Sequence, residues 1–80
     1  SGDGYVAPAG YLQLPPRAGD IQVIVPSTML RADAFGLPVH AFTINERDEM
    51  DRLLALGVRG LITDRPDVAR EAVDAFLAAE

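Results

Sequence analysis

Four carboxylates stand close together in this sequence, and they are the first groups that could do chemistry. They are Glu46, Asp48, Glu49 and Asp51. A divalent cation needs several oxygen ligands that converge on one point, but on a helix positions 46 and 49 share a face while 48 and 51 point elsewhere. Arg47 precedes Asp51 by four residues, and Asp48 precedes Arg52 by the same spacing, as in ion pairs on an exposed helix. The pattern therefore predicts a solvated helix face, not a metal site.

Side chains that serve as nucleophiles and bases are sparse. The chain has no cysteine, which excludes disulfides and thiolate metal sites, and it has no lysine. Ser27 and the single histidine, His40, could be named with an aspartate as a catalytic triad, but nothing in their spacing supports one. No glycine-rich loop of the phosphate-binding type is present. The residues alone indicate no catalytic site.

Size and charge narrow the function classes further. With 80 residues the chain is at most one small domain, although 49% of its residues are hydrophobic. Its 7 basic and 12 acidic residues give a net charge of −5. That balance argues against nucleic acid and anionic membrane surfaces, because both favour a basic patch. No apolar run approaches the roughly 18 residues that a membrane-spanning helix needs.

The first residues favour a piece of a longer protein. The sequence begins Ser1-Gly2-Asp3-Gly4, with no initiator methionine and no signal-peptide pattern. A chain this short buries only about 60% of its unfolded surface, and this one is unusually apolar for that size. We therefore expect a fragment; the alternative is a processed or tag-trimmed small domain.

The chain divides into two regions with different patterns. Residues 1–26 hold four of the six prolines and two short apolar runs, at 11–14 and 21–25. The second run alternates and is rich in β-branched residues, which is typical of strands, and residues 15–20 between the runs are typical of turns. We expect strand and loop over residues 1–26 and βα units over residues 27–80.

Helix-end signals recur through the second region. Ser27 can cap a helix that extends to about residue 35, with Gly36 just past its end, where glycine readily enters the left-handed conformation. Asn45 is a favourable N-cap for a second helix, which Gly57 ends. Pro66 suits the first position of a third helix. Apolar residues then recur at the spacing of one helix face; they are Ala69, Ala72, Val73, Phe76 and Leu77.

Two short apolar runs, at residues 39–43 and 61–63, predict buried strands in a repeated context. Each follows a helix with a glycine stop and ends in threonine, after which the chain reaches a polar residue, Asn45 or Asp64. Successive βα units imply parallel strands with right-handed crossovers, and such strands are buried on both faces. Two or three of them cannot form a covered sheet, so we expect neighbours that this chain does not supply.

This region resembles the closing signature of the glycerophosphodiester phosphodiesterase family. Residues 37–45 read Leu-Pro-Val-His-Ala-Phe-Thr-Ile-Asn, residues 56–58 read Leu-Gly-Val, and residues 60–67 read Gly-Leu-Ile-Thr-Asp-Arg-Pro-Asp. The family typically reads Leu-x-Val-x-x-Trp-Thr-Val-Asn, an acidic helix ending Leu-Gly-Val, and Asp-Gly-Ile-Ile-Thr-Asp-x-Pro. Residues 12–15 and 21–26 resemble the strand and insertion before it more weakly. Two positions depart from the pattern: Phe42 replaces the usual Trp, and Arg59 replaces an acid.

The resemblance implies an α/β fold made of the C-terminal βα units of a (β/α)8 TIM barrel, about the last three. Barrel active sites lie at the carboxyl ends of the strands, so residues 43–45 and 63–64 would lie on the active-site rim. Phe42 matches the family's aromatic residue, which lines the glycerol side of the pocket, and is our one substrate-binding candidate. The alternative is that Phe42 only fills the barrel.

The same resemblance implies hydrolysis of glycerophosphodiesters to glycerol 3-phosphate and an alcohol, with a divalent cation, Mg or Ca. Two histidines would do the acid and base work, while the cation and basic groups would stabilise charge on the phosphoryl oxygens. The family takes these groups from earlier motifs, and this chain has no His-Arg-Gly, His-Asp or Glu-x-Lys sequence. His40 stands where the family varies, so we expect a strand residue. We expect no catalytic residue and no metal ligand here, and no activity from the chain alone.

Two hypotheses follow for the chain as a whole. In the first it is part of a hydrolase that acts on small-molecule glycerophosphodiesters. In the second it is a complete, non-catalytic α/β module for binding or assembly, derived from that barrel. Either way, open strand edges and an uncovered apolar face favour association. We expect the chain to self-associate or to pair with the rest of the barrel, with no nucleic acid partner and no membrane span.

Overall fold

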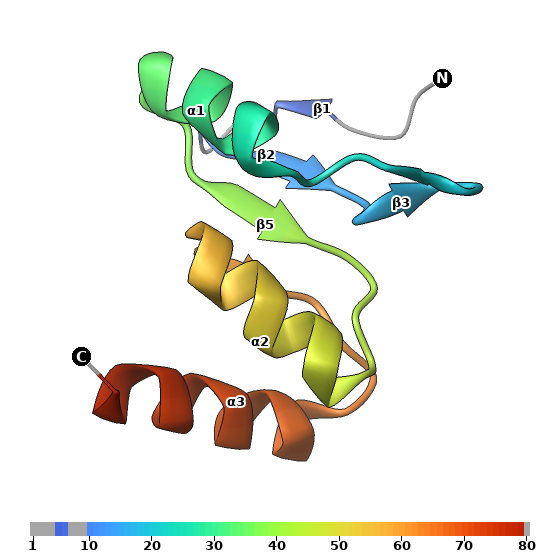
Figure 1. Ribbon diagram of the computed structural model, residues 1–80, viewed down its shortest axis with the longest axis vertical. Helices are drawn as coiled ribbons and strands as arrows, with labels where there is room; N and C mark the ends of the chain where they lie inside the picture. Colours follow the sequence, from blue (N-terminus) through green and yellow to red (C-terminus); the bar gives the residue numbers. More distant parts are fainter. Residues whose placement is uncertain (1–4, 7–9, 80) are drawn as a thin grey trace.

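Strands and helices alternate along most of the chain (Figure 1). The computed structural model describes residues 5–6 and 10–79. The strands are β1 (Tyr5–Val6), β2 (Leu12–Leu14), β3 (Arg17–Ala18), β4 (Ile21–Gln22), β5 (Val39–Ala41) and β6 (Gly60–Leu61). The helices are α1 (Pro26–Ala34), α2 (Arg47–Leu56) and α3 (Pro66–Ala78). The loop predicted near the amino terminus lies partly outside the described residues, at 1–4 and 7–9.

The main sheet has the order β1-β2-β5-β6, with β2, β5 and β6 parallel and β1 antiparallel to β2. The parallel strands with intervening helices confirm the predicted α/β class. Regular pairing is shorter than the predicted strands 39–43 and 61–63. The backbone ladder nevertheless continues past them, because Phe42 N–H donates to the Leu14 carbonyl at 3.1 Å and Ile44 N–H to the Ile62 carbonyl at 2.9 Å.

The strand predicted at residues 21–25 is shorter than expected. Only Ile21–Gln22 is a strand, and it pairs with β3 in a separate two-stranded hairpin. The Val23 N–H extends this pairing by one residue, donating to the Pro16 carbonyl at 2.8 Å; the Ile24 N–H shares the same acceptor at 3.4 Å, and α1 begins two residues later. The strand of the parallel sheet in this region is β2.

Helix ends follow the sequence signals in most places. Gly57 ends α2 in the left-handed conformation, at φ +102°, and Pro66 begins α3. The predicted Ser27 cap is wrong by two residues: Val25 is the N-cap of α1, because Pro26 suits the first helical position and the Thr28 hydroxyl accepts from Val25 N–H at 3.4 Å. No helix within residues 10–79 is long and apolar enough to cross a membrane.

The core lies between the helices and one face of the sheet. Val39 and Ala41 of β5 are 1% and 0% exposed, whereas His40 between them is half-buried. This alternation is that of a strand with one face packed. The rest of the buried cluster comes mainly from the helices and the loops beside them: Ile24, Met29, Ala32, Ile44, Met50, Leu53, Leu54, Val58 and Ala72.

The opposite face of the sheet carries an aromatic stack over a glycine. The rings of Tyr11 and His40 are 4.2 Å apart between centroids and 24° from parallel. His40 pairs in register with Gly60 of β6. A Cβ atom added at Gly60 would lie 2.9 Å from the His40 ring carbon Cγ. Gly60 therefore leaves the space that the imidazole occupies.

We expect Gly60→Ala to lower the free energy of unfolding by about 1–3 kcal/mol, the usual cost of overpacking. The cost should shrink in a His40→Ala background, because the atoms that meet the new methyl group are then absent. Urea unfolding of the two single variants and the double variant measures this coupling. An equal cost of Gly60→Ala in both backgrounds would contradict the packing argument.

Candidate functional site

The loops that follow β2, β5 and β6 meet at one edge of the sheet. Because these strands are parallel, their carboxyl ends lie on the same side. The chain there continues into the hairpin after β2, into residues 42–46 after β5 and into residues 62–65 after β6. The predicted rim motifs at 43–45 and 63–64 are therefore neighbours. We call this edge the rim.

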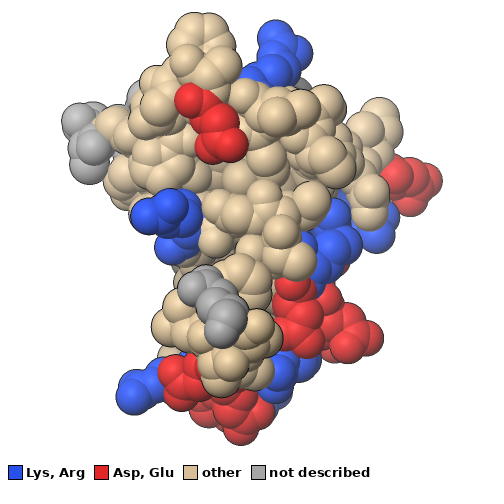
Figure 2. Space-filling model, turned by 60° about the vertical axis from the view of Figure 1, so that its left-hand side comes forward, with Lys and Arg blue, Asp and Glu red and all other residues tan. Residues whose placement is uncertain are grey.

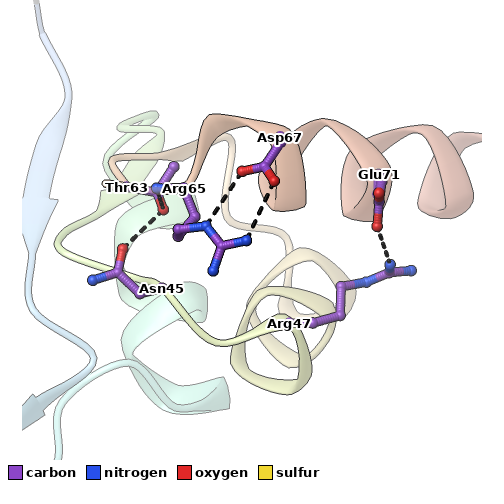
Figure 3. Close-up of polar contacts among 6 residues, drawn as sticks. All are labelled: Asn45, Arg47, Thr63, Arg65, Asp67 and Glu71. Carbon is purple, nitrogen blue, oxygen red and sulfur yellow. Dashed lines mark hydrogen bonds and ion pairs between the residues drawn. The ribbon is translucent and has the colours of Figure 1, made fainter.

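The side chain of Asn45 joins two of these loops (Figure 3). Its Oδ1 accepts from the Thr63 hydroxyl at 3.0 Å and from Asp64 N–H at 2.9 Å. Its Nδ2 donates to Asp64 Oδ2 at 3.3 Å, and the Thr63 hydroxyl in turn accepts from Arg65 N–H at 2.9 Å. The N-cap predicted for Asn45 is wrong: Glu46 is the N-cap of α2 and makes no side-chain cap bond. The amide is engaged by the neighbouring loop instead.

Phe42 lies on the sheet face that the helices leave open. Its side chain is half-buried, and strand alternation places it on the same face as His40. Its own N–H bonds to Leu14 of β2, and Ile44 two residues later bonds to Ile62 beyond β6. The backbone on both sides of Phe42 is therefore fixed to the neighbouring strands. These bonds set the position from which the Phe42 side chain extends at the rim.

Two carboxylates of α2, those of Glu49 and Asp51, are held in ion pairs. Arg47 contacts Asp51 at 3.0 Å, as predicted, and also Glu71 of α3 at 3.7 Å. The predicted pair of Asp48 with Arg52 is wrong: Arg52 Nε and Nη2 donate to the two carboxylate oxygens of Glu49, each at 2.9 Å. These hydrogen bonds lower the pKa of Glu49; burial opposes the shift, and the charges of Arg52 and Arg17 add to it.

The acidic residues of α2 do not fit a metal ion. The spacing Glu-x-Asp occurs twice there, at 46–48 and 49–51, but Glu49 and Asp51 are each occupied by an arginine. Within residues 5–6 and 10–79, no three histidine or acidic side chains are grouped so that they could hold a metal ion.

The remaining candidates for chemistry lie apart. Ser27 is exposed in the first turn of α1, and His40 lies in β5 against the Tyr11 ring. No hydrogen bond joins the two side chains in the part of the chain that the structure describes. Sequence reasoning missed the Asn45 contact, although the repeat did place Asn45 and Asp64 at equivalent positions after successive strands.

Comparison with known proteins gives a consistent result. The model of the glycerophosphoryl diester phosphodiesterase family matches residues 6–68. The chain is 44% identical over 62 residues to the "Probable glycerophosphodiester phosphodiesterase 2" of Mycobacterium tuberculosis, covering 78% of this chain and 24% of that protein. It also resembles the crystal structure of a Silicibacter pomeroyi protein assigned to the glycerophosphoryl diester phosphodiesterases, with a TM-score of 0.58 and 32% identity over 65% of this chain and 18% of that one. The chain thus spans about a quarter of its curated relative.

We expect Asn45→Ala to destabilise the rim. It removes three hydrogen bonds at an exposed site, each with a net contribution of about 0.5–1.5 kcal/mol at most, so the free energy of unfolding should fall by roughly 1–2 kcal/mol. Amide hydrogen exchange at Asp64 should accelerate, because that N–H loses its acceptor. Gln22→Ala, which removes an exposed amide in the hairpin, is the control. Unchanged exchange at Asp64 in Asn45→Ala would contradict this role.

Proposed function

The chain belongs to the glycerophosphoryl diester phosphodiesterase family, and we propose that it forms the last βα units of an enzyme that hydrolyses glycerophosphodiesters to glycerol 3-phosphate and an alcohol. The observation that carries the proposal is the family match over residues 6–68. The meeting of both rim motifs through Asn45 supports it. Barrel enzymes place their active sites at this end of the strands.

In this proposal the chain supplies the rim and not the phosphate chemistry. Its histidine is stacked against Tyr11, and the Glu49 carboxylate is bound to an arginine. Enzymes of the family are generally metal-dependent, and we propose Mg or Ca as the cation, held by residues in the rest of the barrel. A divalent cation there would stabilise negative charge on the phosphoryl oxygens.

The role that we propose for Phe42 is contact with the glycerol part of the substrate. Its ring is half-buried on the open sheet face, and its backbone is fixed on both sides. An aromatic face suits the carbon chain of glycerol, because it buries apolar area while leaving the hydroxyl groups to polar neighbours. Phenylalanine in place of the family's Trp offers a smaller face and no N–H donor.

Open apolar surface supports the proposal that the chain pairs with the rest of a barrel. Leu30 and Phe35 are 70% and 78% exposed. Between β2 and α1 lies a groove of about 540 Å³, lined mostly by apolar residues: Leu12, Leu14, Ala32, Phe35 and Leu37. Figure 2 shows few charges over the upper half of one face, whereas acidic and basic side chains adjoin one another at the lower end. Leu12 and Leu14 pair in register with Val39 and Ala41, so the groove lies on the helix side of the sheet, where a neighbouring helix of the barrel would pack.

We expect the full-length enzyme to release glycerol 3-phosphate from glycerophosphodiesters in the presence of a divalent cation, and a chelator to abolish the release. Phe42→Ala should lower kcat/KM about tenfold, a loss of about 1.4 kcal/mol, and Phe42→Trp should retain activity. The 80-residue chain alone should release nothing above background. Metal-dependent turnover by that chain alone would overturn the division of roles.

We expect the isolated 80-residue chain to self-associate through its uncovered apolar surface. Sedimentation velocity should show a species larger than 8.6 kDa that shifts with concentration. Phe35→Ser should weaken the association, because it removes the most exposed of the large apolar side chains; Ala55→Ser, on an exposed position of α2, is the control. A sharp monomer with cooperative unfolding would contradict the expectation.

A further inference from the structure

The β3–β4 hairpin is fastened to the protein by residues 23–25, which lead from it into α1. The Pro16 carbonyl accepts from Val23 N–H and Ile24 N–H, and the Thr28 hydroxyl donates to the Val23 carbonyl. The Ile24 side chain is 0% exposed and belongs to the core. The hairpin is therefore held at its base by both hydrogen bonds and burial.

Arg52 of α2 adds a second attachment. Its Nη1 donates to the Ile24 carbonyl at 3.2 Å, while Nε and Nη2 hold both oxygens of Glu49 at 2.9 Å. The planar guanidinium suits this two-pronged geometry, which a lysine cannot reproduce. One side chain thus ties the hairpin base to α2 and neutralises the carboxylate beside it. We call these contacts the Arg52 clamp.

Between the hairpin and the loop after β5 the rim has an open, solvent-facing cavity of about 300 Å³. The hairpin contributes Arg17, the loop contributes Thr43 and Glu46, and α2 contributes Glu49. A cavity of that size is at the lower end of the range for small-molecule sites. It lies at the carboxyl ends of β2 and β5, on the same rim as Phe42 but on its hairpin side.

The polar groups of this cavity are balanced in charge. Glu49 is neutralised by the Arg52 clamp, and within the described part of the chain neither Arg17 nor Glu46 takes part in an ion pair. The guanidinium donates hydrogen bonds, the carboxylate accepts them, and the Thr43 hydroxyl can do both. A neutral alcohol with several hydroxyl groups can satisfy all of them. A quaternary ammonium group has no hydrogen-bonding atoms and would gain none of these contacts, while Arg17, Thr43 and Glu46, which are exposed, would stay bonded to water.

We propose that this cavity, walled by the clamped hairpin, is the subsite for the alcohol portion of the glycerophosphodiester and that it favours a neutral polyol such as glycerol over choline. The inference rests on the function proposed above. A diester whose alcohol lacks hydroxyl groups forgoes the hydrogen bonds that glycerol would make here, and each such bond has a net contribution of about 0.5–1.5 kcal/mol, or somewhat more to a charged group. Arg17 is then a substrate contact, and Arg52 is a positioning residue that acts through the hairpin and Glu49.

The test compares two substrates of the full-length enzyme, the diester with glycerol as its alcohol and the diester with choline. Arg17→Met removes the donors while keeping an unbranched side chain. It should lower kcat/KM for the glycerol diester about tenfold, as expected for one hydrogen bond to a charged group, mainly through KM. The choline diester should change less than about twofold. Arg70→Met, which removes an exposed arginine on α3, is the matched control.

Arg52→Lys extends the test to the clamp. It keeps the positive charge beside Glu49 but loses the two-pronged contact, so it should reduce the preference for the glycerol diester as Arg17→Met does. Loosening of the hairpin base should also speed amide exchange at Val23 and Ile24, whose N–H groups donate to the Pro16 carbonyl. Equal losses on both substrates, or an unchanged preference in Arg17→Met, overturn the subsite while leaving the proposed function intact. A wild-type enzyme that hydrolyses neither diester overturns the proposed function, and the subsite falls with it.

Discussion

Burial of one face of β5 is the constraint on which the rest of the structure depends. Val39 and Ala41 are almost completely removed from water, and strand side chains alternate between faces, so His40 and Phe42 must point to the opposite side. A slip of one residue in the register would exchange the two sets and expose the core. Phe42 therefore reaches the open face because its neighbours are hydrophobic, and no specific contact of its own ring is needed to place it.

The rim above this sheet is held by polar contacts of long side chains. Asn45 reaches forward to the loop after β6, and Arg52 reaches back to the segment between the hairpin and α1. Both residues belong to the βα unit of β5 and α2, which is thus joined to its neighbour on either side. These contacts are exposed or partly exposed, so each contributes modestly to stability. Their larger effect is to fix where the loops lie relative to one another.

The parts of the fold that depend on local signals could be predicted from the sequence. The contacts between residues far apart in the sequence could not. Gly57, Pro66 and the apolar periodicity act within a few residues, and they gave the helix ends and the parallel βα order. Asn45 can cap its own helix or bond to a distant loop, and only the approach of Thr63 and Asp64 decides between them. Arg52 can pair with Glu49, three residues earlier, or with Asp48, four residues earlier. Its hydrogen bond to the Ile24 carbonyl favours the side-chain rotamer that contacts Glu49. The same limit applies to residues 21–25, where alternation indicates a strand but not its partner.

In the proposed division of roles, a piece that supplies no catalytic group still affects the rate of the barrel enzyme. Contacts with parts of the substrate that do not react can be used to orient the bond that does, so their loss lowers kcat as well as affinity. A rim that moves by an ångström would lose such contacts, because orientation depends on the geometry of the whole bound substrate. The two ties, at Asn45 and Arg52, limit that movement without adding groups near the phosphate. In the proposed enzyme, selection of the substrate and chemistry at phosphorus would therefore be separated, the first resting on these loops and the second on residues elsewhere in the barrel.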